Sequence, residues 1–314
     1  MVTVLFIAGG GRSGSTILHN LLGQIDGFVA VGELRYIWGR AALKNQSCGC
    51  GVPFSQCVFW HDVMIKAFGG LDRSMAREML DLTESFRIRN LPLMAVPAVR
   101  RRELRRLRTY IERLGRLYSA IQQVSGCDVI VDSSKNPSYG YLLDRVDGVE
   151  VHHLHFVRDA PPVAHSWGGY KDFEPGVPMA RKDTTASATQ WMARNLTAEL
   201  FAGHETVRRR LRYEDFIAQP RDHIRSVLRW LGRPTDDLPF VSAHEVRIDR
   251  PNHSVFGNSV RFQLGTVALR PDERWRREMR RADRMKVAGV TWPLRLRYGY
   301  LTGPARATTD RVPA

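Results

Sequence analysis

The sequence of 314 residues contains no apolar run long enough to cross a membrane. Its longest apolar stretch covers residues 2–8, whereas a membrane-spanning helix needs about 20 such residues. No basic flank precedes this stretch and no small-residue cleavage site follows it, so it does not resemble a secretory signal. We therefore expect a soluble, cytoplasmic protein without a transmembrane segment.

Cysteine is also scarce. The four cysteines, Cys48, Cys50, Cys57 and Cys127, are too few for a disulfide scaffold in a chain of this length. Three of them share the segment SCGCGVPFSQCVFW, where His61 is the nearest histidine, but no C-x-x-C pair completes a tetrahedral zinc site. Zinc binding and a local disulfide remain alternatives. We favour plain packing or an acceptor-site loop, and predict no metal.

Lysine contributes little of the positive charge. Six lysines and 41 arginines stand against 32 acidic residues, which gives a net charge of +15. Genomic base composition can produce this bias without any function, but such a charge also favours anionic partners. We expect the run RRRELRRLR at residues 100–108 to be a solvated helix face, with docking of an acidic acceptor or surface as the alternative.

Short apolar runs separated by helical segments predict an α/β fold, in which helices flank a P-loop-like parallel β-sheet. Strands are predicted at residues 3–8, 28–31, 128–132, 149–157 and 206–215. A mainly helical insertion, residues 35–125, follows the second strand, and we place it on the acceptor side. Within it, apolar residues three and four apart predict one amphipathic helix from Leu104 to Ile121. Residues 1–303 are predicted to form a single domain and residues 304–314 a flexible tail.

A glycine-rich turn, GGGRSGST at residues 9–16, follows the first strand and opens a helix. Such a turn directs backbone N–H groups and the positive end of the helix dipole at one anion. It nearly matches the nucleotide-binding loop G-x-x-x-x-G-K-[ST], but Ser15 stands where an NTPase needs lysine. It also matches G-x-G-x-x-G, with Glu33 beyond the second strand. A Rossmann-type NAD(P)-dependent oxidoreductase and an atypical P-loop kinase therefore stay open as alternatives.

The stretch GGRSGSTIL resembles the phosphosulfate-binding loop of sulfotransferases that use 3′-phosphoadenylyl sulfate (PAPS). Its arginine variant looks most like the tyrosylprotein sulfotransferases and a broad set of bacterial relatives. The resemblance implies that Arg12, Ser13, Gly14, Ser15 and Thr16 bind the donor, with no lysine or metal required in the loop. It extends over about residues 3–300.

Two later segments are similar to further blocks of the same family. In HFVRDAPPVAHSW, Arg158 and Ser166 resemble the site for the donor's 3′-phosphate, and Asp159 can cap the helix between them. The simpler interpretation is that Arg158 only caps the strand end or pairs with Asp159. VDSSKNPSYG resembles an Asp-x-x-Lys-x-Pro turn that puts Lys135 near the cofactor or acceptor.

Two other positions keep competing interpretations. Asp132 could instead be mistaken for the magnesium-binding aspartate of an NTPase, which is the strongest argument for the kinase alternative. Tyr213 can pack near the adenine or the acceptor, although an aromatic residue there is more often part of the core.

VGELRYIW is similar to the Gly-Glu segment that supplies the base in the glutamate-using branch of the family. The resemblance implies Glu33 as general base and Arg12 as the group that stabilises the leaving phosphate. A salt bridge of Glu33 with Arg35, or a helix cap, is the structural alternative.

We thus predict transfer of a sulfuryl group from PAPS to an acceptor hydroxyl. A carbohydrate, lipid, phenolic metabolite or peptide acceptor would each suit this chemistry, and no nucleic-acid partner is expected. A basic polyanion-binding protein is the non-enzymatic alternative.

Overall fold

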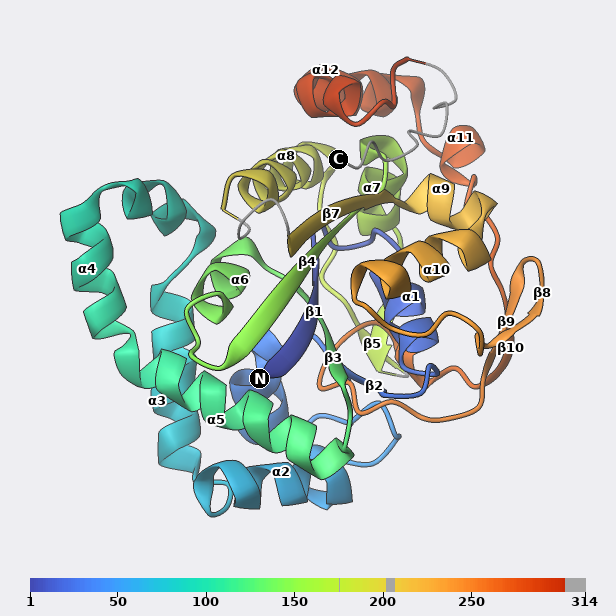
Figure 1. Cartoon of the computed structure of the whole chain (residues 1–314). Helices are drawn as coiled ribbons and strands as arrows, with labels where there is room; N and C mark the ends of the chain where they lie inside the picture. The colour runs from blue at the N-terminus through green and yellow to red at the C-terminus, as the bar shows by residue number, and fades with distance from the viewer. Residues whose placement is uncertain (175, 202–206, 303–314) are drawn as a thin grey trace, which may run out of the picture.

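A five-stranded parallel sheet forms the centre of the molecule, in the order β2-β3-β1-β4-β7 (Figure 1). The structure is a computed structural model, and it describes residues 1–174, 176–201 and 207–302. The strands of this sheet are β1 Val2–Ala8, β2 Phe28–Gly32, β3 Val129–Lys135, β4 Val149–Val157 and β7 Arg208–Arg212. Helices cover both faces (Figure 1), which confirms the predicted α/β class.

The remaining elements surround this sheet. Two small antiparallel sheets consist of β8 Phe240–Ser242, β9 Glu245–Ile248 and β10 Gly265–Ala268, and of β5 Asp172–Glu174 and β6 Val177–Pro178. The α-helices are α1 Ser15–Leu22, α2 Val58–Phe68, α3 Arg73–Ser85, α4 Pro97–Arg106, α5 Arg108–Ser125, α6 Pro137–Leu143, α7 Ala160–Gly168, α8 Thr184–Phe201, α9 Tyr213–Ala218, α10 Pro220–Trp230, α11 Trp275–Glu278 and α12 Arg281–Arg297. Shorter turns are the 3₁₀ helices η1 Leu34–Tyr36, η3 Phe54–Gln56, η4 Ile88–Ala95 and η6 Ser259–Phe262, and the π-helix η2 Ile37–Ala42.

The apolar run of β1 reflects burial on both of its faces. Val4 and Phe6 join the hydrophobic cluster that contains the inner side chains of α5, whereas Leu5 and Ile7 join the cluster beneath α1 and α10. A central strand of a parallel sheet buries side chains on both faces, because helices pack on both sides of it. The first strand is therefore a continuous apolar run rather than an alternating one.

The carboxyl ends of the five strands meet at one edge of the sheet, as in other parallel α/β folds. This edge carries the glycine-rich turn after β1, Glu33 after β2, Lys135 at the end of β3, Arg158 after β4 and Tyr213 after β7. Five segments that are distant in the sequence thus contribute to one region.

Two of the predicted strands differ from the structure by more than one residue at an end. The predicted strand 206–215 ends at Arg212, because Tyr213 begins α9, and residue 206 lies outside the described residues. The predicted strand 128–132 begins at Val129 and continues to Lys135, with every residue of β3 buried.

The predicted amphipathic helix is confirmed over α5, where Leu114, Leu117 and Ile121 are buried, but its start is wrong, because the helix breaks at Leu107 and Leu104 belongs to α4. No residue of α4 is buried, whereas Leu107 is fully buried. The chain therefore changes direction at Leu107, where it reaches the core. The helical insertion itself is confirmed, since most of the chain from η1 to α5 is helical. The predicted tail, residues 304–314, lies outside the described part of the chain.

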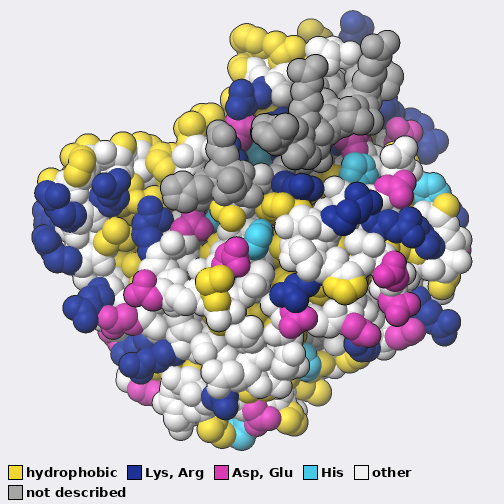
Figure 2. Space-filling view, viewed as in Figure 1, with side chains coloured by type: hydrophobic (Ala, Val, Ile, Leu, Met, Phe, Trp, Pro, Cys, Tyr) yellow, Lys and Arg dark blue, Asp and Glu magenta, His cyan; other side chains and the backbone are white. Residues whose placement is uncertain are grey.

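Arginine side chains gather over α4, at the left of the molecule in Figure 2. Because this helix buries none of its residues, it fits the predicted solvated face. None of the helices in the described residues combines the length and the apolarity that crossing a membrane requires.

Candidate active site

The glycine-rich turn has a backbone that only small residues allow. Gly14 precedes α1 with a left-handed φ of 85°, and a Cβ there would lie 2.7 Å from the ring of Tyr213. A Cβ at Gly9 would lie 2.6 Å from the carbonyl oxygen of Phe156. Arg12 also has a positive φ, 66°, which is uncommon for a residue with a side chain. Gly14 caps α1 without a side-chain hydrogen bond, so the first amides of the helix suit an anion.

Several buried donors at this edge have no hydrogen-bond partner among the described residues. They are Nε and Nη1 of Arg12, Oγ of Ser13 and Nε of Arg158. Buried polar atoms almost always have a partner, so such a group of orphaned donors needs an explanation. Guanidinium and hydroxyl donors match the oxygens of a phosphate or sulfate. An anionic ligand is therefore the partner that this edge of the sheet fits.

Positive side chains also crowd together beside the turn. The guanidinium of Arg12 lies 4.8 Å from the centre of the Trp167 ring, and the ammonium of Lys182 lies 3.9 Å from it. Burial lowers the pKa of Lys182 to about 8, and nearby arginines, Arg12 among them, add to this shift. Burial lowers the pKa of Lys171 as well, with further contributions from Arg12 and Arg158. Cations that disfavour one another's charge in this way indicate a site for an anion.

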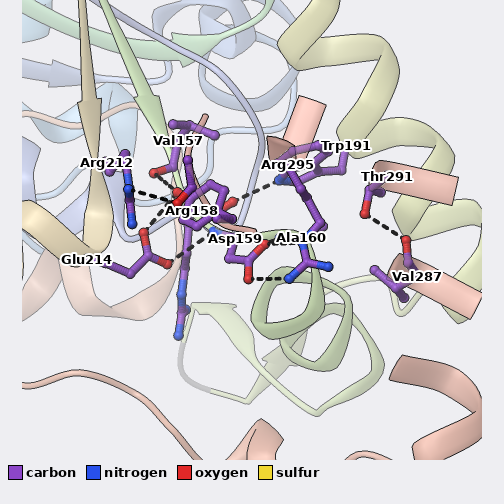
Figure 3. A network of polar contacts seen from close by, with 12 residues as sticks. Val157, Arg158, Asp159, Ala160, Trp191, Arg212, Glu214, Val287, Thr291 and Arg295 are labelled. Carbon is purple, nitrogen blue, oxygen red and sulfur yellow. Dashed lines mark hydrogen bonds and ion pairs between the residues drawn. The ribbon is translucent and has the colours of Figure 1, made fainter. Parts of the chain in front are cut away.

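Arg158 turns away from its neighbour in the sequence. Its Nη2 donates to the carbonyl oxygen of Asp272 at 3.0 Å, and its guanidinium lies 4.5 Å from the centre of the Tyr213 ring. Asp159 instead accepts two hydrogen bonds from Arg295, at 2.7 and 3.0 Å, and caps α7 as predicted (Figure 3). The simpler interpretation, in which Arg158 pairs with Asp159, is therefore wrong.

Tyr213 joins the turn to Arg158. Its ring contacts Gly14 on one side and lies under the guanidinium of Arg158. The two strands that carry the turn and Arg158 are adjacent, with Ala8 of β1 paired to His155 of β4. The anion-binding groups of the turn and of Arg158 thus lie at the same edge of the sheet, on adjacent strand ends. Ser15 and Thr16, which are also predicted to bind the donor, begin α1 directly after the turn. Ser166, which is predicted to act together with Arg158, is a largely buried residue of α7.

Glu33 and Lys135 form an ion pair at the neighbouring strand ends. Oε1 of Glu33 lies 2.8 Å from Nζ of Lys135, and the two side chains are 14% and 6% exposed. The backbone N–H of Glu33 donates to the carbonyl oxygen of Phe256 at 3.3 Å. Glu33 therefore forms the salt bridge that the structural alternative described, but with Lys135 and not with Arg35, because β2 and β3 are paired in parallel. The negative charge of Glu33 also acts on Arg12, where it partly offsets the lowering of the arginine pKa by burial.

Asp132 belongs to the core rather than to a metal site. It is fully buried, accepts a hydrogen bond from the hydroxyl of Tyr118 at 2.5 Å, and accepts another from the backbone of Ser134 at 2.7 Å. Burial raises its pKa to about 6. These bonds engage both carboxylate oxygens, so the strongest argument for a magnesium-dependent kinase loses its support.

The sequence matches the sulfotransferase family over residues 5–237, which is well over half of the chain. The chain belongs to the sulfotransferase family. This assignment favours the predicted transferase over the oxidoreductase, kinase and polyanion-binding alternatives. No curated protein matches the sequence.

Solved structures of bacterial sulfotransferases are similar to this one in fold. A sulfotransferase domain of the Synechococcus PCC 7002 olefin synthase is 16% identical, covers 93% of this chain and 94% of its own, and has a TM-score of 0.51. A sulfotransferase domain of the curacin biosynthetic pathway is 14% identical, with 92% and 97% covered and a TM-score of 0.49. At 16% identity the likeness to the olefin synthase domain shows its α/β fold and nothing finer.

Membership of the family implies PAPS as the sulfuryl donor, and the residues of this sulfotransferase fit such a molecule. PAPS carries a phosphosulfate group and a separate 3′-phosphate. The orphaned donors of Arg12 and Ser13 belong to one anion-binding group, and that of Arg158 belongs to another at the adjacent strand end. Two anionic groups on one ligand match two such positions.

A cleft of about 490 Å³ opens beside the ion pair of Glu33 and Lys135. Arg35 and Asn136, which follow these two residues closely in the sequence, form part of its wall. The other lining residues come from η4 with the residues before it, and from α8: Glu84, Arg87, Ile88, Arg89, Gln190 and Arg194. Four arginines against a single carboxylate make this cleft of the sulfotransferase basic. The helical insertion supplies one of its walls.

Several cations of this site were not among the predicted residues. Lys171 and Lys182 lie close enough to Arg12 to share its electrostatic field. Arg194 lines the cleft and also a small void beside the glycine-rich turn. No motif marks these residues. The one available signal was that two of only six lysines in the chain follow closely after the segment HFVRDAPPVAHSW.

Proposed function

We propose that this sulfotransferase moves a sulfuryl group from PAPS to an acceptor hydroxyl, with Glu33 as the general base. The observation that carries the proposal is the group of buried, unpartnered donors on Arg12, Ser13 and Arg158 at adjacent strand ends. Arg12, Ser13, Gly14, Ser15 and Thr16 hold the phosphosulfate. Arg158 and Ser166 hold the 3′-phosphate, and Tyr213 packs between the two groups.

In the proposed reaction the acceptor oxygen attacks sulfur in line with the departing phosphate. An O–S bond forms, the S–O bond to the phosphate breaks, and the acceptor proton passes to the carboxylate of Glu33. Lys135 fixes the position of that carboxylate through the 2.8 Å ion pair. Arg12 stabilises the charge that develops on the leaving 3′,5′-ADP, and a positioned donor of this kind contributes roughly 10²–10³-fold. The carboxylate base resembles that of the glutamate-using branch of the family.

The basic cleft suggests how the acceptor enters. Its wall includes residues next to Glu33 and Lys135, so a hydroxyl presented from the cleft can reach the proposed base. Arg35, Arg87, Arg89 and Arg194 favour an acceptor that carries negative charge beside its hydroxyl. We therefore propose that the acceptor is acidic. We also propose that the helical insertion lies on the acceptor side of the site.

Calorimetric titration with 3′,5′-ADP, 5′-AMP, NAD and ATP-Mg tests the proposed donor. We expect 3′,5′-ADP to bind at least about 30-fold more tightly than 5′-AMP, because a charged hydrogen-bonded pair is worth about 2–5 kcal/mol. Added magnesium should have no effect on this affinity. Tight binding of NAD or ATP-Mg alone would contradict the proposal, and equal affinity for the two adenylates would remove the 3′-phosphate site.

Replacing Arg87 and Arg89 together by alanine tests the acceptor side. These exposed arginines are each worth about 0.2–1 kcal/mol, so we expect the KM for an acidic acceptor to rise about 2- to 10-fold. The KM for PAPS should stay unchanged. The matched control is Arg101→Ala with Arg102→Ala on α4, which should leave both constants as they are. An acceptor KM that does not move, or a preference for neutral acceptors, would contradict an acidic substrate.

A further inference from the structure

Three cysteines and one histidine meet in a compact cluster away from the proposed donor site. The cluster consists of Cys48, Cys50, Cys57 and His253, and its four ligand atoms all lie within 4.8 Å of one another. His253 lies 196 residues beyond Cys57, whereas His61, the nearest histidine in the sequence, pairs with Asp62 at the surface. The fold therefore supplies the ligand that the sequence segment lacked.

The separations in the cluster match the edges of a metal tetrahedron. Sγ of Cys57 lies 3.6 Å from Sγ of Cys48 and 3.7 Å from Sγ of Cys50. Nδ1 of His253 lies 3.5 Å from Sγ of Cys57 and 3.7 Å from Sγ of Cys48. Zinc bonds of about 2.3 Å to sulfur and about 2.0 Å to nitrogen give tetrahedral edges of about 3.8 Å and about 3.5 Å. A disulfide requires about 2.05 Å between its sulfurs, so these thiols are free.

The surrounding backbone holds the three sulfurs in place. The backbone N–H of Cys48 donates to the carbonyl oxygen of Val52 at 2.8 Å, and the N–H of Gly51 donates to the carbonyl oxygen of Cys48 at 2.8 Å. The N–H of Cys57 donates to the carbonyl oxygen of Phe54 at 3.2 Å, so each cysteine lies in a hydrogen-bonded turn or next to one. Only glycine fits between the first two cysteines, because a Cβ at Gly49 would lie 2.1 Å from the side-chain oxygen of Asn252.

The histidine is held equally firmly. Its ring stacks on Phe59 at 4.3 Å, and its carbonyl oxygen accepts a hydrogen bond from the indole of Trp60 at 2.9 Å. Buried Arg261 donates to the carbonyl oxygen of Ser47, next to the cluster. The cation partly offsets the negative charge that three thiolates and one dication leave behind.

We propose that Cys48, Cys50, Cys57 and His253 form a structural zinc site. Three thiolates and one imidazole are a donor set that prefers zinc, and four protein ligands leave no open position for catalysis. Binding releases the thiol protons to solvent and changes no oxidation state. The proposal is independent of the reaction proposed above.

The zinc site joins the insertion to a late segment that supports the active site. Gly49 donates to the carbonyl oxygen of Ser254 at 2.9 Å, and the hydroxyl of Ser254 contacts His19 of α1 at 2.9 Å. Two residues later, Phe256 accepts the hydrogen bond from the backbone of Glu33. The metal thus fixes residues 253–256 against both the helix that follows the glycine-rich turn and the strand end that carries Glu33.

Metal analysis of the purified wild-type protein tests the site directly. We expect about one zinc per chain by elemental mass spectrometry. Exchange for Co²⁺ should give the strong visible absorption of a tetrahedral thiolate site. Purified protein that is free of zinc and yields no such cobalt spectrum would overturn the proposal, as would a disulfide among these cysteines under non-reducing conditions. Neither readout depends on sulfotransferase activity, so failure here leaves the proposed reaction untouched.

Matched variants assign the ligands. We expect His253→Ala to lose most of its zinc and to shift the cobalt spectrum, whereas the surface variant His61→Ala keeps both. In the same way, Cys57→Ser should lose zinc and Cys127→Ser should retain it, because Cys127 lies outside the cluster. Full zinc content in both His253→Ala and Cys57→Ser would overturn the ligand set. A variant that does not fold leaves the wild-type measurement to decide.

Discussion

Glu33→Gln should lower kcat by about 10²–10⁴-fold, the usual contribution of a general base. The amide is nearly the same size as the carboxylate and can still accept a hydrogen bond from Lys135, but it cannot take the proton of the acceptor hydroxyl. Affinity for 3′,5′-ADP should change little, because the donor-binding groups on Arg12, Ser13 and Arg158 are untouched. Steady-state kinetics and calorimetry on the same preparation measure both quantities.

Loss of stability needs to be separated from loss of chemistry in this variant. The side chain of Lys135 is 6% exposed, and breaking a buried pair can cost about 3–5 kcal/mol. Thermal melting with and without 3′,5′-ADP shows whether the variant is folded at the assay temperature. The control is Glu78→Gln. This change removes a carboxylate of the insertion that forms an ion pair with Arg113 at the surface. Near-normal turnover in Glu33→Gln would remove Glu33 from the role of base.

Arg158→Ala should mainly affect the donor and not the chemical step. We expect 3′,5′-ADP to bind at least about 30-fold more weakly, while 5′-AMP, which lacks the 3′-phosphate, loses little affinity. The comparison of the two ligands in both proteins isolates the contact with the 3′-phosphate. Calorimetric titration gives the four dissociation constants.

Arg295→Ala provides the control for the donor site. Arg295 lies on α12 and binds Asp159, the direct neighbour of Arg158, whereas the side chain of Arg158 extends away from this pair (Figure 3). Its loss should reduce stability and leave the preference for 3′,5′-ADP intact. If Arg158→Ala retains the full preference, the 3′-phosphate is bound elsewhere.

Local patterns were enough to predict the first strand, the glycine-rich turn and the start of α7. Each depends on residues within a few positions of one another: glycines that allow positive φ, and Asp159 followed by prolines that suit a helix start. The parallel sheet followed from short apolar runs that are separated by helical segments. These patterns predict the local backbone conformation of the segments that carry the site residues.

Contacts between distant segments could not be predicted in the same way. The structural alternative for Glu33 named nearby Arg35 as a partner, but Lys135, which lies 102 residues away, is the partner because β2 and β3 are neighbours in the sheet. His253 escaped notice among the ligands of the cysteine cluster for the same reason. The break at Leu107 depends on where the core ends, which no helical period reveals.

The hydrogen bond from Glu33 to Phe256 also bears on the order in which a newly made chain matures. The proposed base is synthesised early, yet its backbone is tied to a residue made more than two hundred positions later. Long-range contacts of this kind form late in folding, because the intervening chain first has to be ordered. A nascent polypeptide that has emerged only through β7 would therefore lack this anchor, so the proposed base is fixed in place only after Phe256 has been made.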